Sequence, residues 1–248
     1  MILSFLHFVR LLIGFADLIF MTAIVYGLSF LPLSCLGKWY RCLFRYWCWV
    51  FIRALRVDLF LHQKNLHALP QHYILIGNHP SAFEDLGMSA LFDSYFLAKV
   101  EMKDWLILGR ISQAAGTIYV QRDSKDSRQE ASDTLRLALE KGLNVGLYPE
   151  GGCKGRRIFL PFRYGAFELS LKTGTPIVPV FIHYEAQESF EWQSQHLLYK
   201  LWMILRAQNH RANYYVYDAI LPSQFNSKED FCNYVQNLYI EWQKKYLE

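Results

Sequence analysis

Charged residues are scarce in this chain, and its composition excludes several classes of protein. They make up 19% of the 248 residues, below the usual share of about 25%, while 52% of the residues are hydrophobic. So apolar a chain is neither intrinsically disordered nor collagen-like. Its apolar residues are spread along the chain and do not gather into several runs of about 20, which disfavours a multi-span transporter. One domain with an appendage fits the length best.

Cysteine is also sparse. The chain has five cysteines, an odd number, and no two of them form a Cys-x-x-Cys pair. A disulfide framework and a structural zinc site are therefore disfavoured, and a reducing compartment is the simpler interpretation.

The positive charge lies in the N-terminal part of the chain. Residues 1–70 carry seven Lys/Arg and two Asp, a net charge of +5, whereas residues 71–248 have a net charge of −1. A nucleic-acid binder would more often carry the basic excess on its folded domain. Basic residues beside apolar ones suit the anionic face of a membrane. We therefore expect a lipid bilayer as a partner and no nucleic acid.

No charged residue occurs between residues 18 and 37, a stretch long enough to span a bilayer as a helix. Pro32 should break or kink this helix. A cleavable signal peptide fits worse, because its apolar core would be shorter and would follow a basic start. We expect a first apolar helix, a break at Pro32 and a second helix. Full crossing of the bilayer and insertion into one leaflet both remain open.

Residues 38–61 are rich in aromatic side chains and arginines. Within about a third of a helical wheel fall Arg41, Arg45, Arg53 and Arg56. This combination favours the membrane–water interface; the alternative is an ordinary amphipathic helix packed on a core. The prediction is a unit of membrane-anchoring and interfacial helices over residues 1–66, followed by a second domain over residues 67–248.

After Pro70 short apolar runs alternate with amphipathic stretches. The predicted strands are Tyr73–Gly77, Tyr95–Lys99, Thr117–Gln121, Val145–Tyr148, Ile177–His183 and Tyr214–Asp218. The predicted helices are Ser127–Lys141, Gly165–Lys172 and Lys228–Lys245. This alternation indicates an α/β fold, a mixed, largely parallel sheet flanked by helices. In such sheets the chemistry lies on loops beyond the strand ends.

A histidine follows the first of these strands directly. His79 comes two residues after Gly77, and two carboxylates follow it, Glu84 and Asp85. Such a carboxylate can accept one ring N–H and leave the other nitrogen as a general base. No further ligands at fixed spacing accompany His79, so we predict no metal site. Ser81 is a conceivable nucleophile, but no Gly-x-Ser-x-Gly elbow surrounds it.

Two other strand ends carry cations. Arg122 directly follows the predicted strand Thr117–Gln121, and another strand runs into a glycine-rich loop, Tyr148–Arg157. Glycines let backbone N–H groups approach an anion, and arginine suits bidentate recognition of phosphate. Together with His79, the two loops favour a phosphorylated substrate.

Four motifs, in this order, resemble the glycerolipid acyltransferase family, which includes the bacterial 1-acyl-sn-glycerol-3-phosphate (lysophosphatidic acid) acyltransferases. The first looks like the family's Asn-His-x-Ser-x-x-Asp pattern, the second ends in an arginine, and the third looks like Phe-Pro-Glu-Gly. They are Asn78–Glu84, Gly116–Arg122, Tyr148–Gly151 and Thr175–Val180. The resemblance covers about residues 72–184, and it identifies residues 67–248 as an acyltransferase catalytic domain.

The resemblance implies transfer of a fatty acyl group from a thioester, on coenzyme A or acyl carrier protein, to a lysophospholipid hydroxyl. With 1-acyl-sn-glycerol-3-phosphate as the acceptor, the product is phosphatidic acid. His79 would be the base, and Glu84 or the adjacent Asp85 would orient it. The hydroxyl would attack the thioester directly, without an acyl-enzyme. The acyl thioester is a co-substrate, and no other cofactor is implied.

The same resemblance assigns the phosphoglycerol part of the acceptor to Arg122 and to the loop that begins with Glu150 and Gly151. Glu150 would bind a glycerol hydroxyl or pair with Arg122. Weaker predicted substrate-binding residues are Gly152, Lys154 and Arg156. The chain departs from the family at Glu84 and again at Gly152 and Cys153, where hydroxyl and basic or small residues are usual.

Basic residues near the membrane place the catalytic domain on its cytoplasmic face, in bacteria the inner membrane. Four alternatives stay open. The acceptor is another lysolipid, the donor is a phospholipid, the chain is a lipid-binding protein without activity, or it is a hydrolase that releases free fatty acid.

Overall fold

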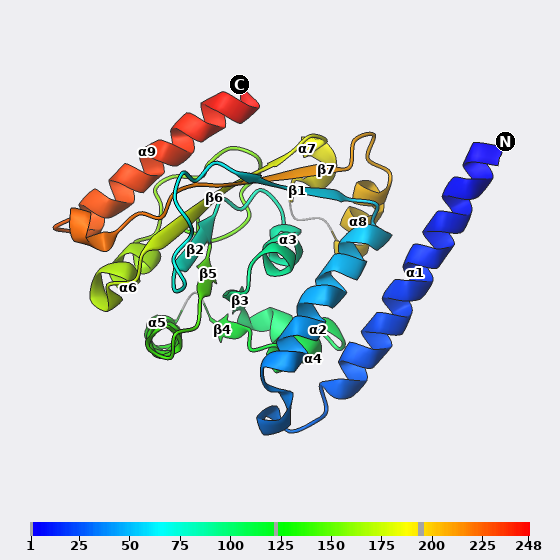
Figure 1. Cartoon of the computed structure of the whole chain (residues 1–248), viewed down its shortest axis with the longest axis horizontal. Coiled ribbons are helices and arrows are strands. Elements are labelled where there is room, and N and C mark those ends of the chain that lie inside the picture. The colour runs from blue at the N-terminus through cyan, green and yellow to red at the C-terminus, as the bar shows by residue number, and fades with distance from the viewer. Residues whose placement is uncertain (1, 122–123, 193–195) are drawn as a thin grey trace.

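A mostly parallel sheet forms the centre of the computed structural model, which describes residues 2–121, 124–192 and 196–248 (Figure 1). In these residues seven strands pair in the order β1-β7-β6-β2-β5-β3-β4. Their bounds are β1 (Asp58–Gln63), β2 (Ile74–Gly77), β3 (Tyr95–Lys99), β4 (Ile118–Val120), β5 (Val145–Leu147), β6 (Ile177–Tyr184) and β7 (Arg211–Val216). Only β6 and β7 pair antiparallel. The sheet confirms the predicted fold class.

Helices cover both faces of the sheet, and the apolar strand residues alternate between them. In β2, Ile74 and Ile76 pack against α5 (Lys125–Glu140), α6 (Gly165–Thr173) and α9 (Lys228–Leu247). Leu75 faces the other way. Because successive side chains of a strand point to opposite faces, one apolar strand builds two cores.

The second face carries the N-terminal helices and most of the shorter ones. They are α1 (Ile2–Leu28), α2 (Leu33–Ala54), α3 (Glu84–Leu91), α4 (Leu108–Ala114), α7 (Gln187–Phe190) and α8 (Leu197–Leu205). Two 3-10 turns, η1 (Val100–Asp104) and η2 (Pro222–Gln224), complete the elements.

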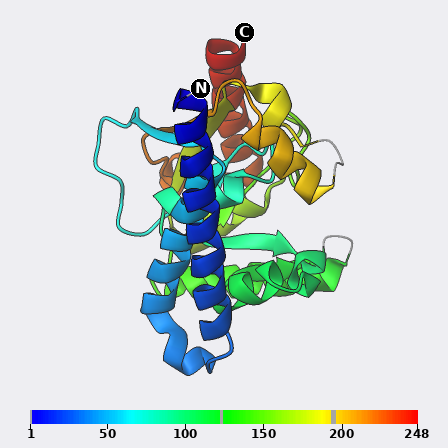
Figure 2. The same ribbon diagram turned by 90° about the vertical axis from the view of Figure 1, so that its right-hand side faces the viewer.

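Helices α1 and α2 run side by side along one edge of the molecule (Figures 1 and 2). The Trp47 indole donates to Thr22 Oγ1 at 2.9 Å, and the Tyr40 hydroxyl donates to the Val25 carbonyl at 3.0 Å. The predicted break at Pro32 is confirmed, since α1 ends at Leu28 and α2 begins at Leu33. Within α1, residues Val9–Leu28 are long and apolar enough to cross a membrane, and only 6% of that stretch is buried in the protein.

The prediction of a helix through residue 61 is wrong at its end. Helix α2 stops at Ala54, and residues 58–63 form strand β1, which pairs parallel with β7. The sheet therefore begins before the predicted boundary at residue 66. Residues 58–63 lack the apolar alternation that would reveal a strand, because β1 is an edge strand and most of its side chains face solvent.

Two arginines of α2 face the protein and not a membrane surface. Arg41 forms an ion pair with Asp93, with Nη2 and Oδ1 2.6 Å apart, and it also donates to the Ala115 carbonyl. Arg45 donates to the carbonyls of Ser89 and Ala90. On this side α2 packs on the protein, as the alternative prediction of an ordinary amphipathic helix has it. Its exposed aromatic residues are Trp39, Tyr46 and Trp49.

The remaining predicted elements are confirmed, five of the six strands within one residue at each end. The exception is β7, which begins at Arg211, three residues before the predicted start. Helices α3, α4, α7 and α8, none longer than nine residues, are not predicted.

Candidate active site

The predicted motifs meet because β2 lies between β5 and β6 and runs parallel to both. The carboxyl ends of parallel neighbours lie at one edge of the sheet, so the loops after β2 and β5 and the end of β6 come together there. Asn78 fixes the first of these loops. Its side-chain amide donates to the Ile182 carbonyl at 2.9 Å and accepts from the Ile182 N–H at 2.7 Å. These two bonds continue the β2–β6 pairing and hold the next residue, His79.

His79 and Glu84 form a buried pair at this edge. The Nδ1 atom of His79 lies 3.0 Å from Oε2 of Glu84, and the two side chains are 8% and 0% exposed. Glu84 opens helix α3, so the turn between strand and helix folds the carboxylate back onto the imidazole. Of the two predicted carboxylates, Glu84 is the one at hydrogen-bond distance from Nδ1. The side chain of Glu84 is one methylene longer than that of the aspartate in the family pattern, and it reaches the ring from the same sequence position.

Both oxygens of Glu84 accept further hydrogen bonds. Oε2 accepts from the Ser81 N–H at 2.9 Å, and Oε1 accepts from the Tyr184 hydroxyl at 2.6 Å. Burial raises the pKa of Glu84, and the hydrogen bonds from Tyr184 and Ser81 act in the opposite direction. Three donors on two oxygens stabilise the ionised carboxylate against this effect of burial, and the ionised form is the one that supports a positively charged imidazole.

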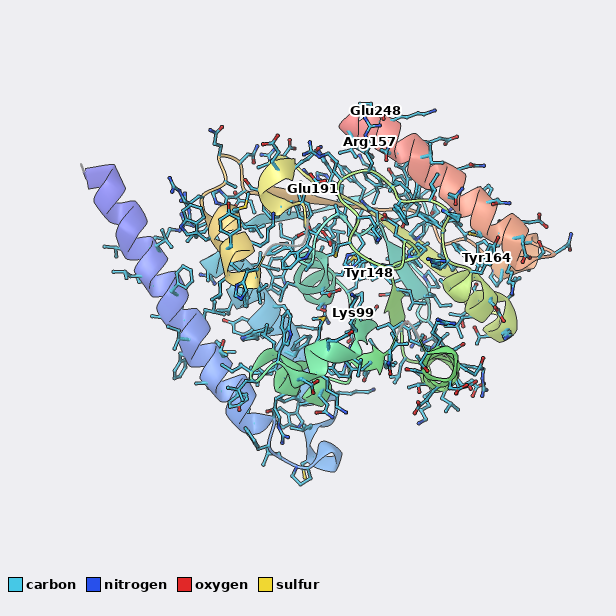
Figure 3. The ribbon with its side chains drawn as sticks, turned by 180° about the vertical axis from the view of Figure 1, so that it is seen from behind. Lys99, Tyr148, Arg157, Tyr164, Glu191 and Glu248 are labelled. Atoms are coloured by element: carbon cyan, nitrogen blue, oxygen red, sulfur yellow. The ribbon has the colours of Figure 1, made fainter. Side chains whose placement is uncertain are left out.

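The imidazole of His79 is also held by a ring. The side chain of Tyr148, labelled near the middle of Figure 3, stacks on it with centroids 4.1 Å apart and planes 9° from parallel. Burial and the negative charges of Asp85 and Glu84 raise the pKa of the Tyr148 hydroxyl, which therefore stays protonated. Packed by Tyr148 and bonded by Glu84, the imidazole is fixed in one orientation.

Glu150 binds the backbone of the site. Its Oε1 accepts from the His79 N–H at 2.7 Å, and its Oε2 accepts from the Phe159 N–H at 2.8 Å. The side chain is 3% exposed. The sequence predicts that Glu150 contacts a glycerol hydroxyl or Arg122; in the structure both oxygens are occupied by backbone donors. It is a positioning residue that ties the loop after β5 to His79.

We expect Glu150 to make stability depend on pH. Burial raises its pKa from 4.5 to about 7, so the folded chain binds this proton at a pH where the unfolded chain has lost it. The free energy of unfolding should therefore fall as the pH rises from about 4.5 to about 7, by as much as about 3 kcal/mol. Thermal unfolding from pH 4.5 to pH 7 measures this, with Glu150→Gln as the variant that lacks the titration.

The matched control is Glu130→Gln, a change of an exposed glutamate on α5. It should keep the pH dependence of the wild type. An unchanged pH dependence in Glu150→Gln would contradict the prediction.

The loop after β5 brings a thiol to the histidine. Gly151 has φ of +75°, a left-handed conformation that favours glycine and turns the chain back toward His79. Two residues later, Sγ of Cys153 lies 3.2 Å from Nε2 of His79 and 3.2 Å from the Ser81 carbonyl oxygen. Cys153 is absent from the predicted site, although its departure from the family pattern is a visible signal.

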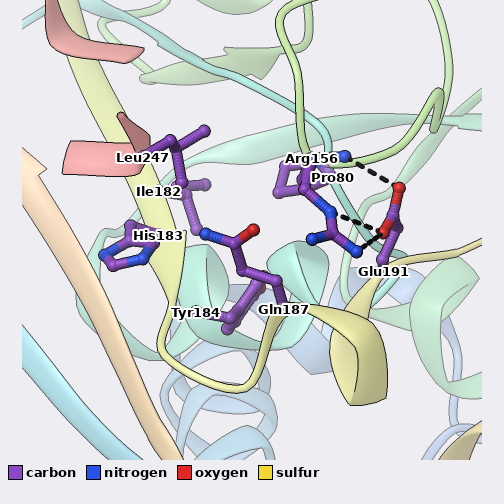
Figure 4. Close-up of a pocket in the computed structure, with 8 residues that line it drawn as sticks. All are labelled: Pro80, Arg156, Ile182, His183, Tyr184, Gln187, Glu191 and Leu247. Carbon is purple, nitrogen blue, oxygen red and sulfur yellow. Dashed lines mark hydrogen bonds and ion pairs between the residues drawn. The ribbon is translucent and has the colours of Figure 1, made fainter. Parts of the chain in front are cut away.

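The predicted cations of this loop have protein partners. Arg156 forms an ion pair with Glu191, with Nη2 and Oε2 2.8 Å apart, beside a small pocket lined by Pro80 and Tyr184 (Figure 4). The ammonium of Lys154 lies 5.1 Å from the centre of the Phe159 ring. Arg157 lies 3.7 Å from Glu248, at the end of α9 (Figure 3). Arg122 lies outside the described residues.

Tyr184, Tyr214 and Glu191 also belong to the site or its border and are not predicted. The hydroxyls of Tyr184 and Tyr214 are 3.2 Å apart, and both side chains are buried. All three residues lie after Val180, where the last of the four motifs ends. From the sequence alone, a tyrosine of the site cannot be distinguished from an ordinary core tyrosine.

The family model described as Acyltransferase matches residues 60–183, half of the chain. The chain therefore belongs to the Acyltransferase family.

Two curated relatives indicate its neighbours within the family. The chain is 30% identical over 115 residues to a 1-acyl-sn-glycerol-3-phosphate acyltransferase of Neisseria gonorrhoeae, a match that covers 46% of this chain and 45% of that one. It is 29% identical over 160 residues to a lyso-ornithine lipid O-acyltransferase of Pseudomonas aeruginosa, covering 62% and 61% of the two chains. The match with the first relative thus spans about half the length of that protein.

The fold is that of a solved relative. The crystal structure of the 1-acyl-sn-glycerophosphate acyltransferase PlsC from Thermotoga maritima matches with a TM-score of 0.61 at 16% identity. The match covers 94% of this chain and 97% of that one. At this identity the likeness concerns the fold alone.

Proposed function

We propose that this protein transfers a fatty acyl group from an acyl thioester to the free hydroxyl of 1-acyl-sn-glycerol-3-phosphate, giving phosphatidic acid. The observation that carries the proposal is the buried His79–Glu84 pair, with 3.0 Å between Nδ1 and Oε2, in a chain of the Acyltransferase family. The donor is a fatty acyl thioester of coenzyme A or of acyl carrier protein, and no resident cofactor is needed.

In the proposed reaction His79 moves the protons. As the acceptor oxygen forms its bond to the acyl carbonyl, Nε2 takes the hydroxyl proton, and the leaving thiolate receives a proton as the carbon–sulfur bond breaks. The carboxylate of Glu84 stabilises the imidazolium that exists between these two transfers. Glu150 and Tyr148 keep the ring in place.

The acceptor is proposed from the relatives and from the cations near the site. Several relatives are named as 1-acyl-sn-glycerol-3-phosphate acyltransferases, in bacteria and in animals. Lys154, on the loop that also carries Cys153, is the proposed phosphate ligand of this loop, since Arg156 is paired with Glu191. Arg122 is the further proposed phosphate ligand.

A second acceptor is supported by a separate observation. The lyso-ornithine lipid O-acyltransferase is matched over 61% of its length, a larger share than that of the Neisseria relative. In addition, Arg156 is already neutralised by Glu191. A lysolipid without a phosphate is therefore the alternative acceptor.

Membrane attachment is proposed from helix α1, whose exposed side chains include Leu12, Ile13, Ile19 and Phe20. A helix with apolar side chains on its outer surface is more stable when lipid replaces the water around it. We place the catalytic domain on the cytoplasmic face, where acyl thioesters occur.

Product analysis tests the proposal. Membranes that contain the protein receive labelled oleoyl-CoA and lysophosphatidic acid, and in parallel lyso-ornithine lipid or other lysophospholipids. We expect labelled phosphatidic acid as the main product. A preference for lyso-ornithine lipid would select the alternative acceptor, and labelled free fatty acid would indicate a hydrolase. A chain that is silent with every donor and acceptor, yet binds lipid, would overturn the proposal in favour of a binding protein.

A further inference from the structure

The side chains of Cys153, His79 and Glu84 form a continuous chain of contacts. Sγ of Cys153 is 3.2 Å from Nε2 of His79, and Nδ1 on the other side of the ring is 3.0 Å from Oε2 of Glu84. A nucleophile beside a base, with the base oriented by a third group, is the arrangement by which cysteine and serine enzymes form covalent intermediates. The imidazole and the thiol come from the loops after two adjacent strands, β2 and β5, and the carboxylate comes from the start of α3.

The thiol proton has two acceptors within reach. The Ser81 carbonyl oxygen can only accept, and it lies 3.2 Å from Sγ. When Nδ1 carries the ring proton and donates a hydrogen bond to the Glu84 carboxylate, Nε2 has a free lone pair and is also an acceptor. The S–H group is therefore held between a carbonyl and the imidazole. Cys153 is half-buried and is not sealed in the core.

The same contact is an obstacle to direct attack by the acceptor. The nitrogen that must take the proton of the acceptor hydroxyl is the one that Cys153 occupies. If the thiol is acylated first, its proton has left, and Nε2 becomes available for the acceptor. A two-step order therefore uses the contact that a one-step order would have to break.

We propose that Cys153 is a catalytic nucleophile that carries the acyl group as a thioester during transfer. This inference rests on the proposed function. In the first step Nε2 of His79 removes the Cys153 proton, Sγ bonds to the donor carbonyl, the donor carbon–sulfur bond breaks, and the thiolate released takes the proton from His79. One thioester replaces another, so no oxidant or energy source is required.

In the second step Nε2 takes the proton of the acceptor hydroxyl, and the oxygen bonds to the acyl carbonyl. The bond between that carbon and Sγ breaks, and His79 returns the proton to Cys153. The enzyme is regenerated and the ester is released. This order differs from the direct attack implied by the family resemblance, in a chain that departs from the family pattern at this residue.

The test measures acylation of the full-length protein in detergent. Labelled oleoyl-CoA is added without an acceptor, the reaction is quenched with acid, and the label on the chain is located by peptide mass analysis. We expect one acyl group per chain on Cys153, released by neutral hydroxylamine as a thioester should be. A chase with lysophosphatidic acid or lyso-ornithine lipid should move the label from the protein into the diacyl lipid.

Variants separate enzymatic acylation from chance acylation. Cys153→Ala and His79→Ala should both lose the label, whereas Cys42→Ala, which removes an exposed thiol on α2, should keep it. Cys153→Ser, if acylated, should carry an oxygen ester that resists neutral hydroxylamine. Thermal unfolding of each variant identifies any that does not fold.

The outcomes distinguish this inference from the proposed function. If the wild type forms diacyl lipid but never carries label on Cys153, or if the label does not pass to an acceptor, the covalent intermediate is overturned and the acyltransferase stands. The same holds if folded Cys153→Ala keeps the full transfer rate. If no acceptor yields a diacyl lipid, the proposed function itself fails.

Discussion

Replacement of His79 by alanine should lower the rate of acyl transfer by about 10²–10⁴-fold, the usual contribution of a positioned general base. The imidazole is the group through which every proton of the proposed reaction passes. It is held between Glu84 and Tyr148. The measurement is the initial rate of product formation from labelled oleoyl-CoA and the preferred acceptor, at equal amounts of folded protein.

The control for this change is His67→Ala. His67 also lies beside a carboxylate, 3.1 Å from Asp218, but its side chain is 85% exposed and it lies outside the site. Its rate should equal that of the wild type. If His79→Ala retained more than about a tenth of the wild-type rate, a general-base role for His79 would have to be given up.

Replacement of Glu84 by glutamine should also be severe, on the order of 10²–10⁴-fold in the turnover rate. The amide keeps the size of the side chain but removes the charge that stabilises the imidazolium. It also replaces one acceptor oxygen by an N–H₂ group, which would face the Ser81 N–H, the Tyr184 hydroxyl or the imidazole. The Michaelis constant for the acceptor should change little, because Glu84 is fully buried and does not touch the lipid.

Asp85→Asn is the matched comparison, because it removes a charge one residue away on the same helix turn. The structure predicts a smaller loss than for Glu84→Gln. Thermal unfolding of both variants separates catalysis from stability, since a buried charge is removed in one of them. A larger loss in Asp85→Asn would make Asp85 the partner of His79 and would mean that α3 begins in a different register.

The central part of the fold could be predicted because the core strands are apolar runs with clear ends. Strand β3 (Tyr95–Lys99) and the start of α6 at Gly165 fall where the sequence predicts them. Strand β1 could not be found, because only two of its six residues are even partly buried and no apolar alternation marks it. The helix predicted through residue 61 failed for the same reason.

Much of the site could be predicted from motifs within one loop. The strand, the turn and the carboxylate that follow one another between residues 74 and 84 place His79 near an acid on purely local grounds. Local sequence could not decide between Glu84 and Asp85, because both are within reach of a flexible turn. The choice depends on where α3 begins and on the hydroxyl of Tyr184, which is 100 residues away.

The class of fold, the apolar N-terminal helix, the histidine and the family pattern follow from the amino-acid sequence, since each depends on residues that are neighbours in the chain. The contact partners of the site residues follow only from the tertiary structure. In the folded chain Glu150 accepts from the backbone N–H of His79, Arg156 pairs with Glu191, and Cys153 contacts Nε2 of His79. These contacts join residues 35 to 74 positions apart. They depend on which strands are neighbours in the sheet, and the order of the strands cannot be read from any local run of residues.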